Sequence, residues 1–150
     1  MKQTKISWPQ AKYIATDLVR RRASSDIDSF TQTLQDARVD LNPHQVESAL
    51  FAFRSPLSGG AILADEVGLG KTIEAGIILS QKWAERKRRL LIIAPANLRK
   101  QWVEELADKF YLPAFILDKK VMTQYLANGE SGNPFEADSI VVCSYDFARR

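Results

Sequence analysis

Ala64-Asp65-Glu66-Val67-Gly68-Leu69-Gly70-Lys71-Thr72 is the segment of this 150-residue chain that best predicts its fold. An apolar run, 61–63, precedes it, and a run with helical character, 73–83, follows it. A strand, a glycine-containing loop, a Lys-Thr pair and a helix form the layout of a phosphate cradle, because the N–H groups of the loop and of the helix start then converge on one point. We expect Lys71 to reach the β- and γ-phosphates of a nucleotide and the Thr72 hydroxyl to hold Mg²⁺.

The stretch departs from the pattern G-x-x-x-x-G-K-[ST] at one position, because Asp65 stands where the first glycine is expected. Gly68 and Gly70, directly before the Lys-Thr pair, still favour phosphate binding over an ordinary surface turn. The run 61–66 also has the form of a strand that ends in a Mg²⁺-binding Asp-Glu pair. One strand end cannot easily supply both the cradle and the carboxylate opposite it, so we expect Asp65 and Glu66 in the loop.

The composition is that of an ordinary folded domain, with 45% hydrophobic and 26% charged residues. The formal net charge of +3 permits nucleic-acid binding without arguing for it. Cys143 is the single cysteine, which excludes an internal disulfide, favours a reducing cytoplasm and predicts a buried hydrophobe rather than a nucleophile. The sequence has no apolar stretch of membrane-spanning length and no signal-peptide pattern, so we expect no membrane partner.

Short apolar runs alternate with helical patterns after residue 60. Strands are expected near 61–64, 90–94, 114–117 and 139–144, and helices over 71–87, 98–110 and 119–127. This alternation predicts an α/β fold with a parallel sheet and helices on both faces. Ligands of such sheets bind at the carboxyl ends of the strands. The cradle, Pro95–Asn97 and Ser144–Asp146 all follow predicted strands, so they are expected to line one face.

The first 40 residues predict two helices, one beginning near Ser7 and one near Ser25. A third helix is expected to begin at Asn42, a good N-cap that is followed by proline. Gln45 then has two interpretations. Its side chain completes a capping box with Asn42, or its planar amide selects adenine over guanine. Spacing alone supports both equally.

Further segments make a resemblance specific. Leu41–Gln45 is similar to the adenine-reading Q motif of the Swi/Snf-type helicase-like ATPases of helicase superfamily two, and 65–72 resembles their motif I, in which the leading Asp-Glu is usual. Leu91–Pro95, with Asn97, Leu98, Gln101 and Trp102, resembles motif Ia, and Val141–Asp146 resembles motif Ic. Glu74-Ala75-Gly76 looks closest to the bacterial RapA-like branch.

The resemblance implies a three-layer, recA-like P-loop NTPase sheet over residues 41–150, incomplete, with residues 1–40 as an N-terminal helical extension. It implies ATP and Mg²⁺ as cofactors, with Lys71 as the catalytic residue and Thr72 as the Mg²⁺ ligand. The nucleotide-binding residues that it implies are Gln45, Asp65, Glu66, Val67, Gly68, Leu69, Gly70, Lys71 and Thr72.

Motifs Ia and Ic imply contact with one DNA strand through Asn97, Arg99, Lys100, Ser144 and Tyr145. Arg99 and Lys100 at a helix start can meet phosphates. The alternative is a solvated first turn of a helix whose residues Trp102, Val103 and Leu106 pack inward. The basic run 86–89 is expected to be a solvated helix end.

The activity implied is ATP-driven translocation along duplex DNA by a cytoplasmic, nucleoid-associated protein, with RNA polymerase or another DNA-bound complex as a further partner by analogy. A carboxylate motif II and a second lobe with its arginine finger do not follow Asp146, so we expect part of a larger ATPase that binds nucleotide but hydrolyses it poorly. A non-catalytic nucleotide-binding or interaction module is the alternative. Motifs Ia and Ic argue against an unrelated P-loop kinase or metabolic NTPase.

Overall fold

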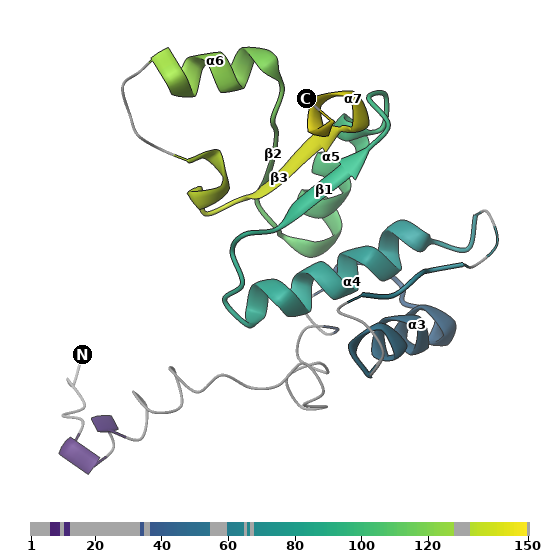
Figure 1. Cartoon of the computed structure of the whole chain (residues 1–150). Helices are drawn as coiled ribbons and strands as arrows, with labels where there is room; N and C mark the ends of the chain where they lie inside the picture. Colours follow the sequence, from purple (N-terminus) through teal and green to yellow (C-terminus); the bar gives the residue numbers. More distant parts are fainter. Residues whose placement is uncertain are drawn as a thin grey trace.

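A computed structural model describes residues 7–9, 11–12, 34, 37–54, 60–64, 66, 68–127 and 133–149. Its main helices are α3 (Pro43–Arg54), α4 (Lys71–Ala84), α5 (Arg99–Phe110), α6 (Lys119–Ala127) and the short α7 (Tyr145–Ala148). The strands are β1 (Leu91–Ala94), β2 (Ala114–Ile116) and β3 (Ile140–Ser144), and a 3-10 turn, η1 (Pro134–Glu136), precedes β3. Figure 1 shows α3 and α4 packed side by side, below the sheet in that view.

The three strands form one parallel sheet in the order β1-β3-β2, which confirms the α/β prediction. β3 lies in the centre, and all five of its residues are buried, as expected of a β-branched strand with neighbours on both sides. Ala94 pairs with Ser144, so β1 and β3 end at the same edge. The strands predicted near 90–94, 114–117 and 139–144 are therefore confirmed to within a residue at each end.

The helices pack around a core that joins α4 and α5. α5 contacts β2 and β3, and α4 contacts both α3 and α5. Gly76 permits the last of these contacts, because a Cβ added there would lie 2.2 Å from the Phe110 ring. Leu106 is buried, and Trp102 and Val103 pack partly buried against the same core, so the inward-facing side of α5 is as predicted.

The strand predicted near 61–64 is wrong. These residues form no strand, and Ile62 is 88% exposed. A parallel strand needs hydrogen bonds from a neighbour, and the three described strands pair only with one another. The chain therefore enters the cradle as an irregular segment and not from the edge of the sheet.

Helix α4 ends at Ala84, short of the predicted bound at 87. Arg86 adopts a left-handed backbone with φ 60°. Its N–H donates to the Trp83 carbonyl over 2.9 Å, and the Lys87 N–H donates to the Lys82 carbonyl over 3.0 Å. These two bonds form the helix-ending motif that usually places a glycine where Arg86 stands.

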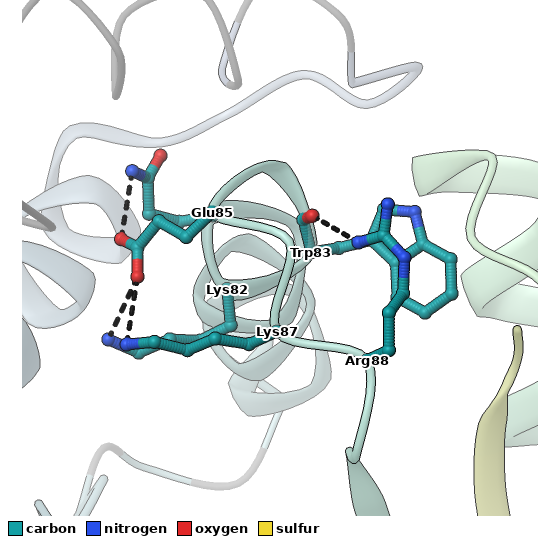
Figure 2. Close-up of polar contacts among 6 residues, drawn as sticks. Lys82, Trp83, Glu85, Lys87 and Arg88 are labelled. Carbon is teal, nitrogen blue, oxygen red and sulfur yellow. Dashed lines mark hydrogen bonds and ion pairs between the residues drawn. The ribbon is translucent and has the colours of Figure 1, made fainter. Parts of the chain in front are cut away.

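The basic run 86–89 lies just beyond the end of α4 and is exposed at Arg86, Lys87 and Arg89, as expected, but it also makes specific contacts. Lys87 lies 3.0 Å from Glu85, and the hydrogen bond to that carboxylate raises the pKa of Lys87 (Figure 2). Arg88 stacks 4.1 Å above the Trp83 ring. The run also reaches the segment before β3, through ion pairs of Arg88 with Asp138 at 3.0 Å and of Arg89 with Glu136 at 3.4 Å. Acidic neighbours thus pair three of its four charges.

Most of the two helices predicted before residue 40 lies outside the described residues. Trp8, Pro9, Ala11 and Lys12 are helical, and the Ala11 N–H donates to the Ser7 carbonyl over 2.8 Å, as a helix beginning near Ser7 requires. In the part of the chain that the structure describes, no helix is both long and apolar enough to cross a membrane.

Candidate nucleotide and nucleic-acid site

The cradle loop changes direction at two glycines with a left-handed backbone. Gly68 and Gly70 have φ angles of 94° and 92°, a region that side chains rarely occupy. The Leu69 N–H donates to the Glu66 carbonyl over 3.3 Å, which closes a tight turn. The Gly70 carbonyl then accepts the N–H groups of Ile73 and Glu74, so α4 begins immediately after the loop. The helix start therefore stands at the loop as a phosphate site requires.

Gln45 connects the start of α3 to this loop. The side chain is only 4% exposed, and its Nε2 donates to the Leu69 carbonyl over 3.0 Å. Its Oε1 accepts the Asn42 N–H over 3.2 Å, which is one of the two bonds of a capping box. His44 Nε2 also lies 3.2 Å from the Leu69 carbonyl. The amide keeps capacity for a second bond at each atom, so adenine reading by Gln45 stays a prediction.

Lys71 and Thr72 border a hollow of about 360 Å³. Gly68, Gly70 and Ile73 line the same hollow from the loop and α4. The Lys71 Nζ donates to the Glu66 carbonyl over 3.0 Å. Two left-handed glycines, a helix start, an ammonium and a hydroxyl at one hollow are the groups that bind a magnesium–nucleotide, so the residues fit these cofactors.

Of the other predicted cradle residues, two are described by the structure and two are not. Asp65 and Val67 lie outside the described residues. Glu66 is exposed, and its carbonyl oxygen accepts from both the loop and Lys71, so its backbone shapes the turn. Leu69 is 44% exposed, and its carbonyl faces α3.

The predicted DNA-contacting residues follow the two strands that end together. Asn97, Lys100 and Tyr145 are exposed, and Tyr145 is 60% exposed. The Arg99 Nε donates to the Ala96 carbonyl over 3.1 Å. Because β1 pairs with β3, the residues that follow β1 and Tyr145, which follows β3, lie at the same edge of the sheet.

Ser144 differs from the other candidates, because it is 8% exposed and its Oγ accepts the Phe147 N–H over 3.2 Å. It is the N-cap of α7, a helix that the sequence analysis missed although a serine at a strand end is a signal for one. Cys143 beside it is buried as predicted, and burial raises the pKa of its thiol while the charge of Arg99 opposes that shift.

Helix α5 adds residues that the sequence analysis did not assign to the nucleotide site. Glu105 and Lys109 line the hollow in front of Lys71. A smaller hollow of about 40 Å³ brings Gln101 and Glu105 to Thr72. Spacing of four residues along α5 was the available signal, because it places all three side chains on one helix face. That this face meets the cradle depends on tertiary packing.

Comparisons with known proteins agree with this fold. A family model described as the SNF2-related domain matches residues 18–150. The RNA polymerase-associated protein RapA of Serratia proteamaculans is 42% identical over 118 residues, which are 78% of this chain and 12% of that protein. RapA of Erwinia tasmaniensis is 39% identical over 132 residues, 87% of this chain and 13% of that protein. The chain thus spans a small part of these relatives.

A solved structure gives the same result for the fold. The SWI2/SNF2 ATPase core of Sulfolobus solfataricus in complex with dsDNA has a TM-score of 0.61 and 24% sequence identity. The similarity covers 74% of this chain and 22% of that chain. The described α/β arrangement therefore has the fold of part of that core.

Proposed function

Because this chain belongs to the SNF2-related family, we propose that it is the ATP-binding part of a DNA-dependent ATPase that moves along duplex DNA. Family membership confirms the Swi/Snf-type resemblance that the four motifs predicted, and the RapA relatives support the expected branch. The proposal for nucleotide binding rests on one observation. Lys71, Thr72 and two left-handed glycines meet at a hollow at the start of a long helix.

Each group of the cradle has a separate task in this proposal. The N–H groups of the loop and of the first turn of α4 bind phosphate oxygens, and the helix dipole favours their charge. The Lys71 ammonium neutralises the phosphates, and the Thr72 hydroxyl orients the metal ion. A bound magnesium–ATP supplies the transferable γ-phosphoryl group. Gln45 holds the Leu69 carbonyl and thereby fixes the shape of the loop.

DNA is the second ligand in the proposal. The Sulfolobus structure contains dsDNA, and this chain presents Asn97, Arg99, Lys100 and Tyr145 at one sheet edge. Arginine and lysine at a helix start suit phosphate oxygens, so these contacts would be independent of base sequence. RapA is RNA polymerase-associated, which supports RNA polymerase as a partner of the whole protein. A cytoplasmic, nucleoid-associated location belongs to the same proposal.

For these 150 residues alone we propose nucleotide binding with slow turnover. No arginine lines the hollow in the described part of the chain, and an arginine finger contributes about 10³–10⁵ in rate. Residues 41–150 would form the ATP-binding lobe, and residues 1–40 an extension that precedes it.

The test uses the full-length protein that contains this chain and measures ATP hydrolysis with and without duplex DNA. Lys71→Ala should reduce DNA-stimulated turnover by roughly 100-fold or more, because a cation that faces the transferred group is lost. Lys87→Ala is the matched control, since it removes a lysine just beyond the far end of α4, where the side chain pairs with Glu85. Turnover that survives Lys71→Ala would contradict the proposal.

A further inference from the structure

A row of polar side chains on α5 faces the cradle. Gln101, Glu105 and Lys109 are spaced four residues apart, so they share one face of the helix. Glu105 and Lys109 line the larger hollow together with Lys71 and Thr72. The contact of α5 with α4, through Phe110 against Gly76, holds this face in place.

Glu105 is bonded through both of its carboxylate oxygens. Its Oε1 accepts from the Gln101 Nε2 over 2.7 Å, and its Oε2 lies 3.0 Å from the Lys109 Nζ. The side chains of Glu105 and Lys109 are 18% and 35% exposed. A carboxylate fixed on one side by an amide can hold a lysine on the other, which reduces the freedom of that long side chain.

A second pair on the same helix shows what an ordinary surface ion pair looks like here. Lys100 lies 3.4 Å from Glu104 at the same four-residue spacing. The side chains of these two residues are 83% and 58% exposed, and neither lines the hollow. The Glu105–Lys109 pair is thus shorter, more buried and turned toward the cradle.

The charges around the larger hollow show what Lys109 adds to it. Among the side chains that line the larger hollow, Lys71 and Glu105 carry opposite formal charges that cancel, and Lys109 makes the sum positive. A nucleoside triphosphate stays negative after binding one Mg²⁺, so a second cation beside the cradle favours it. We propose that Lys109 is a second phosphate-binding cation of the nucleotide site and that Glu105 positions it. This inference rests on the proposed nucleotide binding.

The number of phosphates should decide the size of the effect. If Lys109 meets the phosphates, its removal weakens ATP more than AMP, whereas a general loosening of the fold weakens both alike. Lys109→Ala should weaken ATP binding about tenfold, the loss expected for one partly exposed charge-assisted contact, and change AMP binding little. Lys109→Arg should restore most of the ATP affinity, because the charge and the reach remain.

The experiment is calorimetric titration of the chain with ATP, ADP and AMP in Mg²⁺, with circular dichroism confirming that each variant is folded. Lys87→Ala is the control and should bind ATP as the unmodified chain does, because Lys87 pairs with Glu85 and does not line the hollow. Equal ATP affinity in Lys109→Ala and the unmodified chain, or equal losses for ATP and AMP, would overturn the role of Lys109.

Lys71→Ala separates this inference from the proposed function. If Lys71→Ala abolishes ATP binding and Lys109→Ala does not weaken it, only the role of Lys109 fails. If the unmodified chain binds no ATP, or Lys71→Ala binds it equally well, the proposed site fails and the role of Lys109 fails with it.

Discussion

Gly68 and Gly70 share a left-handed backbone but differ in what surrounds them. A Cβ added at Gly68 would meet nothing within 4 Å. A Cβ added at Gly70 would lie 2.4 Å from the Gln45 Nε2, the atom that donates to the Leu69 carbonyl. The two positions therefore separate the cost of the backbone conformation from the cost of displacing Gln45.

Gly68→Ala should lower the free energy of unfolding by about 1–2 kcal/mol, the cost of a left-handed conformation for a residue with a Cβ. Gly70→Ala should lower it by about 1 kcal/mol more, because the methyl group displaces Gln45 from a hydrogen bond in a buried position. Urea unfolding curves of the two variants measure the difference.

The control is the same pair of substitutions in a Gln45→Ala background. There the added methyl group at position 70 has room, so the costs of Gly68→Ala and Gly70→Ala should become equal. Equal costs already in the unmodified chain would mean that Gln45 does not pack against the loop.

Single residues of the candidate site were partly predictable from the sequence. Lys71, Thr72 and the glycines before them were identified because a phosphate cradle has a local pattern. Gln45 was singled out with two interpretations, and the structure contains the capping bond as well as a bond to the loop. Glu105 and Lys109 could not be assigned to the site, because they come to the cradle only through the packing of α5 on α4.

The end of α4 is a feature of a whole element. The left-handed residue that closes the helix is Arg86, where glycine is usual. Arg86 is exposed, and the two closing bonds come from backbone N–H groups that any residue other than proline supplies. The conformation of Arg86 thus costs stability that a glycine would recover.

Arg86→Gly should raise the free energy of unfolding by about 0.5–1 kcal/mol. Relief of the left-handed conformation contributes about 1–2 kcal/mol, and the larger entropy of an unfolded glycine offsets part of it. Thermal and urea unfolding measure the gain. Arg86→Ala is the control, since it removes the charge but keeps the backbone cost, and a gain of the same size in Arg86→Ala would contradict the explanation.

The conformation of each helix and strand was easier to predict from the sequence than the contacts between elements. The strands Leu91–Ala94 and Ile140–Ser144 followed from short apolar runs between helices, and their parallel pairing followed from the alternation. The run 61–64 has the same local character but lies beside no described strand, and a local pattern does not contain that information. The ion pairs of Arg88 and Arg89 with the segment before β3 were unpredictable for the same reason.

In the molecule as a whole, α5 links the two candidate ligand sites. Arg99 and Lys100 stand at its first turn, beside the edge where β1 and β3 end. Lys109 stands near its other end, at the hollow in front of the cradle. A single helix thus touches both the proposed DNA surface and the proposed nucleotide site, an arrangement suited to an ATPase that responds to DNA.

We propose that the loop before α4 binds the phosphates of ATP, and hydrogen–deuterium exchange of the chain with and without magnesium–ATP reports on that binding at the loop itself. Protection should appear in peptides that cover 64–76, the start of α3 and the C-terminal half of α5, because these segments surround the hollow. The Lys71→Ala variant should show none of it. Unchanged exchange across 64–76, or equal protection in Lys71→Ala, would mean that the loop does not bind the phosphates of ATP with the help of Lys71.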